Sequence, residues 1–225
     1  MMRLDGSSFR KAAAALADAD PGLAGVIQRA GLPAFWHRPP GFATLVLFIL
    51  EQQVSLASAR AVFGRLVERV GTLTPQAIAR LDDDALGRIG LTRQKQRYVR
   101  GLAGAVIEGS IDLDGLEVLS DEEARRQLLR LTGIGPWTAD VYLLSALGRP
   151  DVWPVGDRAL QVGTAETLAL PEVPDPLQLE QIGARWRPWR SVAARLIWHD
   201  YLSRRGRTEP ALEGLAVPGA SGSVD

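Results

Sequence analysis

The sequence has no cysteine and only two histidines, His37 and His199, among its 225 residues. Without thiols the chain cannot form disulfides, thiolate zinc sites or a cysteine-ligated iron–sulfur cluster. Two histidines are also too few to build a histidine-based metal cage. We therefore expect no side-chain metal centre and no cofactor.

Long apolar runs are absent as well. The longest, residues 42–50, is too short to span a bilayer. The first residues lack the basic start and apolar core of a secretory signal peptide. The sequence therefore favours a cytoplasmic protein with no membrane partner.

An excess of charge of either sign is missing, because 26 basic residues balance 26 acidic ones. Taken alone, this balance argues weakly against a nucleic-acid partner. However, residues 85–107 contain five basic residues and no acid, and residues 183–207 contain seven arginines and one acid. Such runs are commonly solvated helix faces, so they only leave DNA or RNA open as a partner.

Alternating strand patterns are absent, and the chain reads as helical nearly throughout. Residues 56–70 carry apolar side chains at spacings of three and four. Thr74 and Pro75 form a helix start, and Ser120 with Glu123 forms a capping box. The other predicted helices cover residues 92–109, 136–147, 157–168 and 191–203, with helical segments before residue 41. We predict an all-α protein of about ten short helices, with residues 211–225 as a flexible tail.

The stretch "LTGIGPWTAD", residues 131–140, lies between two predicted helices. Its two glycines allow a tight turn and a close approach, and we expect Gly135 to adopt a backbone conformation closed to other residues. Pro136 suits the first turn of the next helix. Backbone N–H groups at such a helix start attract anions without any cationic side chain. A DNA phosphate would fit, but a plain helix–turn–helix corner explains "GIG" equally well.

Three ordered motifs make a more specific argument: "GFATLVLFILEQQVSLASA", "LTGIGPWTADVYLLSALGRPDVWPVGDRAL" and "ARWRPWRSVAARLIW". Together they resemble the helix-hairpin-helix (HhH-GPD) DNA glycosylases, and most nearly the AlkA-type 3-methyladenine DNA glycosylase II branch. The resemblance covers residues 41–201. It implies a two-lobed helical fold, with a barrel lobe at 42–153 and a second lobe made of 1–41 plus 154–210. The β-domain of the AlkA prototype should be missing, because the residues before 41 read as helices.

The resemblance gives the catalytic role to Asp157. Breaking an N-glycosidic bond builds positive charge on the sugar, and a nearby carboxylate stabilises it and can position the attacking water. A helix N-terminus would help to keep Asp157 ionised. Without the resemblance, a simple N-cap role explains this aspartate. The neighbours differ from the prototype, since Gly156 and Arg158 replace an acid and a tyrosine. Arg158 is expected to touch a phosphate or to rim the base pocket.

Trp137 stands where bifunctional members of the superfamily carry a Schiff-base lysine. The chain has only two lysines, Lys11 and Lys95, and neither is in the hairpin motif. The resemblance therefore implies a monofunctional glycosylase without AP lyase activity, which leaves the abasic site uncut.

The same resemblance makes Trp137 and Trp198 walls of the base pocket. Electron-rich rings suit N-alkylated purines, which carry positive charge, and they stack on a flipped base. Core packing is the rival role for Trp198. Tyr142 is a further pocket candidate, although Val141 occupies the position of the branch's pocket tyrosine.

DNA contacts are implied for two segments. In "EQQVS", Gln53 corresponds to the wedge that fills the gap left by the extruded base, and Gln52 supports the loop. A polar helix C-terminus is the alternative for both glutamines. At the hairpin and after it, the implied contacts are Gly133, Ile134, Gly135, Thr138 and Arg158. The family also binds a monovalent cation, Na⁺ or K⁺, through hairpin carbonyls, which here are those of Leu129, Leu131 and Ile134.

The expected function is thus excision of alkylated bases, of the 3-methyladenine or 7-methylguanine type, from damaged double-stranded DNA by a monomer. Three alternatives stay open: a glycosylase for oxidised or deaminated bases, a non-catalytic helix-hairpin-helix DNA-binding module, and a helical interaction protein that never meets DNA. Asp157 separates the enzymes from the others, because only an enzyme requires its charge.

Overall fold

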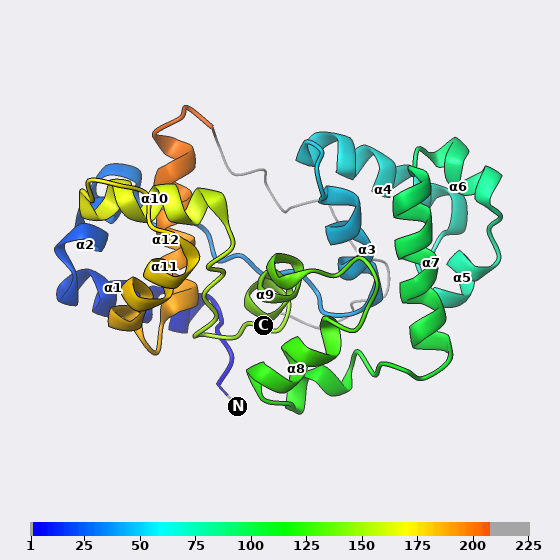
Figure 1. The fold of residues 1–225 in the computed structure, drawn as a ribbon, viewed down its shortest axis with the longest axis horizontal. Coiled ribbons are helices and arrows are strands. Elements are labelled where there is room, and N and C mark those ends of the chain that lie inside the picture. Colours follow the sequence, from blue (N-terminus) through cyan, green and yellow to red (C-terminus); the bar gives the residue numbers. More distant parts are fainter. Residues whose placement is uncertain (1, 208–225) are drawn as a thin grey trace. The chain divides into compact units, whose positions relative to one another are not determined.

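The computed structural model describes residues 2–207. Within this part the chain forms twelve α-helices and two short 3₁₀ helices, and no strand (Figure 1). The all-α prediction is confirmed, with more helices than expected. None of the described helices has the length and apolar character needed to cross a bilayer. The tail predicted at residues 211–225 lies outside the described residues.

The described chain divides into two compact units. Unit 1 contains residues 2–37 and 143–207, and unit 2 contains Arg38–Tyr142. This division falls within a helix, after Tyr142, whereas the sequence-based prediction put the lobe boundary at residue 153. In unit 1, Ser191 Oγ donates to the Arg149 carbonyl (2.6 Å) and accepts from Val152 N–H (2.9 Å). These bonds tie the segment before Trp153 to the last helix of unit 1.

Unit 2 is built around α3 (Phe42–Glu51), whose first nine residues are all buried. Because this helix is apolar on every side, it is covered by other helices, and it packs against α4 and α7. The remaining elements of unit 2 are α4 (Leu56–Val70), α5 (Pro75–Ala79), α6 (Asp83–Ile89), α7 (Arg93–Ile107), η1 (Gly115–Val118), α8 (Asp121–Leu128) and the first part of α9 (Pro136–Ser145).

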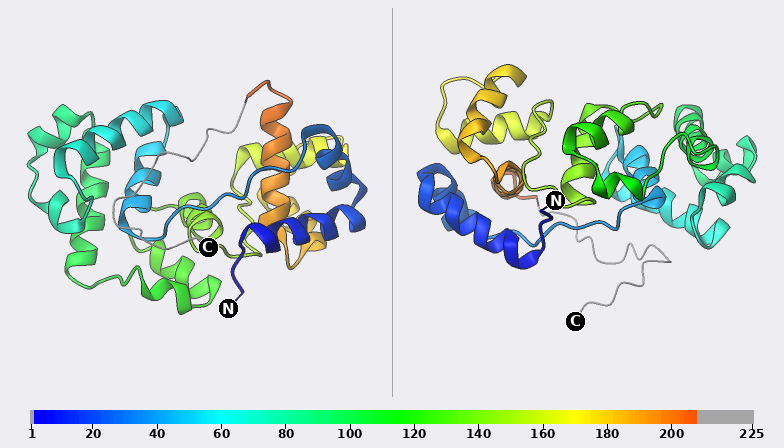
Figure 2. Two further views of the ribbon diagram at one scale, coloured as in Figure 1. Left: turned by 180° about the vertical axis from the view of Figure 1, so that it is seen from behind. Right: turned by 90° about the horizontal axis from the view of Figure 1, so that it is seen from below.

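Unit 1 is built around α12 (Arg190–Ser203), which contacts α1, α2 and α10 (Figure 2). Its first eight residues are buried. The other elements are α1 (Gly6–Ala19), α2 (Pro21–Ala30), the end of α9, α10 (Arg158–Leu168), α11 (Pro176–Gly183) and η2 (Ala184–Trp186). The residues ahead of α3 therefore form two helices and not a β-domain.

Side-chain caps account for most helix starts. Thr74 Oγ1 accepts from Ala77 N–H at 3.1 Å, as the sequence indicated. Ser120 caps α8 through Glu123 N–H at 3.1 Å, but the Glu123 carboxylate pairs with Arg126 (3.2 Å), so the expected capping box forms only by half. Helices α6 and α11 were not predicted, although aspartates cap them in the same way.

Candidate functional site

The hairpin between α8 and α9 is closed by a turn in which the Leu131 carbonyl accepts from Ile134 N–H at 3.0 Å. Gly133 occupies the third position of this turn with φ +91°, a conformation that favours glycine. A Cβ at Gly133 would also lie 2.3 Å from Cγ of Tyr98, on α7. The expectation that Gly135 adopts a backbone conformation closed to other residues was therefore wrong. The turn requires the positive φ at Gly133 instead.

Gly135 has a different role in the hairpin. It is exposed, and a Cβ there would meet nothing within 4 Å. In the described part of the chain, neither Gly135 N–H nor Thr138 N–H finds an acceptor, while Ala139 N–H binds the Gly135 carbonyl at 3.0 Å. The start of α9 thus presents unused backbone donors beside an open surface. Such a surface can receive an anion.

The side chains of the hairpin serve the fold instead. Ile134 is 4% exposed and Thr138 is 3% exposed. On the flanking helices, Arg125 of α8 pairs with Asp140 of α9 at 2.6 Å. Any contact of Ile134 or Thr138 with DNA would therefore run through the backbone.

The loop after α3 is held to the hairpin by Gln52. Its Nε2 donates to the Gly133 carbonyl at 2.8 Å and lies 3.4 Å from Thr138 Oγ1. The next residue, Gln53, is exposed and has φ +59°. A left-handed conformation costs a non-glycine residue about 1 kcal/mol. The loop therefore has a fixed base and a strained, exposed tip.

Two basic side chains anchor that base, and sequence reasoning missed both. Arg38 makes a two-pronged ion pair with Glu51, the last residue of α3, at 3.0 and 3.2 Å, and both side chains are nearly buried. Lys95 donates from Nζ to the Leu50 carbonyl at 2.6 Å, where a cation complements the helix C-terminus. Burial lowers the pKa of Lys95. No local pattern distinguished these residues from other surface cations.

In unit 1, Asp157 is the N-cap of α10, which confirms the helix start expected there. Its Oδ1 accepts from Leu160 N–H at 2.7 Å and from Trp198 Nε1 at 3.0 Å. The carboxylate is half-buried. A negative charge here is favoured by the helix dipole and is held in orientation by two donors.

Trp198 belongs to an aromatic pair that sequence reasoning did not find. Trp36, in the segment before Arg38, meets Trp198 edge to face with ring centroids 6.1 Å apart. The Arg195 guanidinium lies 4.9 Å from the Trp36 ring centroid, within the range of a cation–π contact. Both tryptophans are partly exposed. Their contact joins distant parts of the sequence, so no spacing rule could reveal it.

The other expected pocket and contact residues are divided between the two units. Tyr142 is fully buried in unit 2, where its hydroxyl accepts from Gly41 N–H at 2.8 Å, so we no longer assign it to a base pocket. Trp137 belongs to unit 2 and is 37% exposed. Arg158 is exposed at the start of α10, and its Nη1 lies 3.2 Å from Gln161 Oε1.

The hairpin carbonyls are the remaining candidate group. That of Leu131 closes the turn, while those of Leu129 and Ile134 accept no hydrogen bond from any described residue. Residues 2–207 contain no cluster of histidine and carboxylate side chains that could hold a metal ion. Any cation in this unit would therefore depend on backbone oxygen, which suits hard cations.

Comparison with known proteins places this arrangement in a family. Residues 46–188 match the model of the HhH-GPD superfamily base excision DNA repair proteins. Because the match covers more than half of the chain, the protein belongs to this superfamily.

Two solved structures extend the likeness over nearly the whole fold. One is the Schizosaccharomyces pombe 3-methyladenine DNA glycosylase Mag1 in complex with abasic DNA, at 27% identity and a TM-score of 0.75 over 84% of this chain and 95% of that one. The other is a Bacillus halodurans DNA-3-methyladenine glycosidase, at 31% identity and a TM-score of 0.74 over 92% and 95%.

A curated relative is the probable bifunctional transcriptional activator/DNA repair enzyme AlkA of Mycobacterium tuberculosis, 34% identical over 190 residues. The match covers 80% of this chain but only 37% of the relative.

Proposed function

We propose that this protein is a DNA glycosylase that releases alkylated bases from double-stranded DNA by hydrolysis. The observation that carries the proposal is the Asp157 carboxylate, capped onto α10 and bonded to the indole of a partly exposed tryptophan. The similarity to 3-methyladenine DNA glycosylases supports the same reaction.

In the proposed reaction the bond between the sugar C1′ and the base nitrogen breaks, and its electron pair leaves with the base. Positive charge then builds on the sugar, and the fixed carboxylate of Asp157 stabilises it. A water oxygen bonds to C1′ and gives up a proton to the solvent, while the alkylated base, cationic in the DNA, leaves as a neutral molecule. Leu160 N–H and Trp198 Nε1 hold Oδ1 in place throughout.

Alkylated purines are the proposed substrates because they already carry positive charge. An indole face attracts such a base by about 0.5–2 kcal/mol. Trp198 and Trp137 are the proposed walls of the base pocket, and the edge-to-face contact makes Trp36 a support for Trp198.

In the proposed complex, unit 2 binds the DNA backbone mainly through main-chain groups. The N–H groups of Gly135 and Thr138, which follow the turn at Gly133 and Ile134, would bind a phosphate, and Arg158 of unit 1 a second one. Gln53 is the proposed wedge, and Gln52 fixes its loop. The carbonyls of Leu129, Leu131 and Ile134 are proposed to share Na⁺ or K⁺ with the hairpin phosphate. Replacing K⁺ by tetramethylammonium at constant ionic strength should then weaken DNA binding.

We also propose that the enzyme is monofunctional. Trp137 offers no amine at the hairpin, and Lys95 donates its amine to the Leu50 carbonyl. Borohydride added during the reaction should therefore trap no covalent protein–DNA adduct. Size-exclusion chromatography should give a monomer. The expected cytoplasmic location remains part of the proposal.

The decisive experiment measures bases released from methylated DNA, with abasic sites and strand breaks scored separately. Release of 3-methyladenine without strand breaks, abolished by Asp157→Asn, would support the proposal. Release of 8-oxoguanine or hypoxanthine alone would point to the oxidised- or deaminated-base alternative. Tight DNA binding with no release of any base would leave a DNA-binding module.

A further inference from the structure

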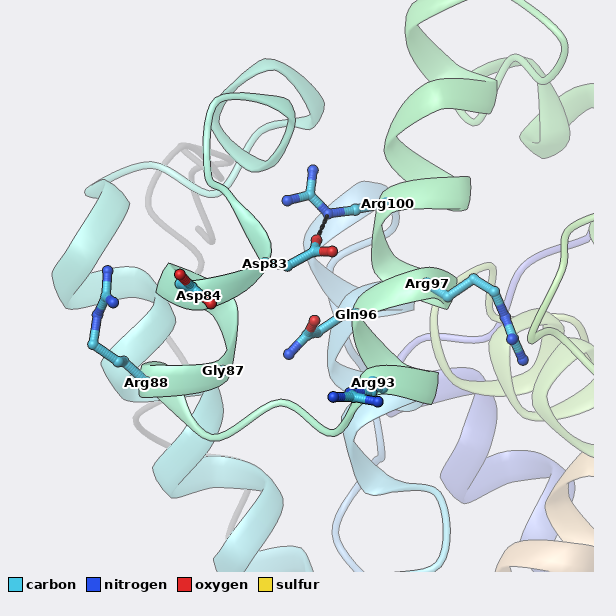
Figure 3. Close-up of a pocket in the computed structure, with 8 residues that line it drawn as sticks. All are labelled: Asp83, Asp84, Gly87, Arg88, Arg93, Gln96, Arg97 and Arg100. Carbon is cyan, nitrogen blue, oxygen red and sulfur yellow. Dashed lines mark ion pairs between the residues drawn. The ribbon is translucent and has the colours of Figure 1, made fainter.

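A basic pocket lies between α6 and α7 of unit 2. Its volume is about 860 Å³. Figure 3 shows its lining, which includes four arginines and only two acids: Asp83, Asp84, Gly87, Arg88, Arg93, Gln96, Arg97 and Arg100. The proposed glycosylase reaction gives none of these residues a task.

Charge in this pocket is only partly neutralised. Arg100 pairs with Asp83 at 2.8 Å and also donates to the Leu81 carbonyl. Within residues 2–207, by contrast, Arg88, Arg93 and Arg97 have no carboxylate partner, and all three are exposed. These three arginines, called the basic band below, therefore keep their charge available to an anion.

Local geometry adds to the positive potential. Arg93 is the first residue of α7, just after the Thr92 cap, so its charge adds to that of a helix N-terminus. Gln96 is 9% exposed and fixed by a 2.9 Å bond to the Leu91 carbonyl. In Figure 3, Arg93 extends from α7 toward α6, whereas Arg97 points to the other side of α7. The basic band thus crosses α7.

On that other side the basic band approaches the hairpin. The Arg97 guanidinium lies 5.5 Å from the Tyr98 ring centroid. The Tyr98 ring in turn fills the space where Gly133 lacks a side chain. The hairpin and the basic band are therefore neighbouring parts of one unit, connected through Tyr98.

We propose that the basic band binds a second segment of DNA backbone, several phosphates away from the one held by the hairpin. This inference rests on the proposed function, because it takes the hairpin as the first contact. Arginines that point in different directions from two helices match an extended polyanion better than one small anion. Guanidinium groups also bind phosphate oxygens in a two-pronged manner.

The test compares Arg93→Gln/Arg97→Gln with Arg10→Gln/Lys11→Gln, which removes equal charge from exposed positions on α1. Binding to a duplex with an abasic-site analogue is measured by fluorescence anisotropy across a salt series. The slope of log K against log salt is negative, and each lost phosphate contact should make it shallower by about 0.9. Near 0.1 M salt, each lost contact should weaken the affinity roughly eightfold. The α1 control should keep the wild-type slope, and unchanged melting temperatures should show that both variants fold.

Duplex length sharpens the test. On a duplex cut back to the base pairs next to the abasic site, which keeps the hairpin phosphate but lacks the phosphates several positions away, the variant should bind like the wild type, because the second segment is missing. An equal slope for variant and wild type on long duplexes would overturn the inference. Competition by inorganic phosphate at constant ionic strength would also overturn it. If phosphate displaces DNA fully from the wild type but not from the variant, the basic band is a site for a small anion.

The two proposals fail in distinguishable ways. If the wild type releases bases but the Arg93→Gln/Arg97→Gln variant binds DNA with the same salt dependence as the wild type, only this inference fails. If no base is released but the slope falls as expected, the basic band stands and the glycosylase reaction fails.

Discussion

The two units contribute to the proposed reaction by opposite means. In unit 1, the proposed function depends on a side chain, the Asp157 carboxylate, which accepts hydrogen bonds from Leu160 N–H and Trp198 Nε1. In unit 2, the hairpin offers backbone N–H groups at Gly135 and Thr138 and buries the side chains of Ile134 and Thr138. A chain with no net charge can thus bind a polyanion partly through its backbone. The Asp157 site is tested by removing the charge of its side chain, and the hairpin site is tested by adding a methyl group beside its backbone N–H groups.

The largest effect is expected from Asp157→Asn. Asparagine also caps helices well and can still accept from Leu160 N–H and Trp198 Nε1, so stability should hardly change. Only the charge is lost, and base release should fall by about 10³-fold or more, as for other electrostatic and acid–base groups. Single-turnover release from methylated DNA measures this. Full activity in a folded variant would remove Asp157 from the mechanism.

The two hairpin glycines should respond differently to alanine. In Gly133→Ala, the new methyl group would be strained at φ +91° and would collide with the Tyr98 ring. Together these effects should lower the free energy of unfolding by on the order of 3 kcal/mol. Gly135→Ala finds open space. Its melting temperature should stay the same, while the new methyl group should weaken DNA binding about tenfold by holding the phosphate away from the amides. Equal melting losses for both variants would contradict this division.

The same two regions show what the sequence could reveal. The helix start at Asp157 was predicted correctly, and its catalytic role stays a prediction that rests on the coincidence of a capping position with a family motif. The glycine that carries the unusual backbone was misassigned, because turn type depends on the 131–134 hydrogen bond and not on composition. Trp36 was missed because its contact with Trp198 joins chain segments far apart.

Secondary structure was easier to predict than contacts. Helices with clear apolar spacing, such as α4 and α7, were found. The short helices α6 and α11 were overlooked, although Asp82 and Asp175 signalled their starts. The anchoring of the loop by Arg38 and Lys95 depends on tertiary packing, which no local pattern encodes.

A smaller effect is expected from Trp198→Phe. Phenylalanine keeps a ring beside Trp36 but removes the 3.0 Å bond to Asp157. A hydrogen bond to a charged group contributes about 1.5–3 kcal/mol, so base release should slow by about tenfold or somewhat more. Trp36→Phe is the matched control, because it changes the same aromatic pair but keeps the indole of Trp198 that donates to Asp157. If both variants slow the chemical step equally, the bond from Trp198 does not orient the carboxylate.

The smallest change in stability is expected from Gln53→Gly. Glycine relieves the strain at φ +59° but adds freedom to the unfolded chain, so the free energy of unfolding should stay within about 1 kcal/mol of the wild type. Base release from a fully paired duplex should nevertheless fall several-fold, because the wedge is gone. A lesion opposite a mismatched base is extruded more easily, so the loss should be smaller there. An equal loss on paired and mismatched duplexes would show that Gln53 does not act as the wedge.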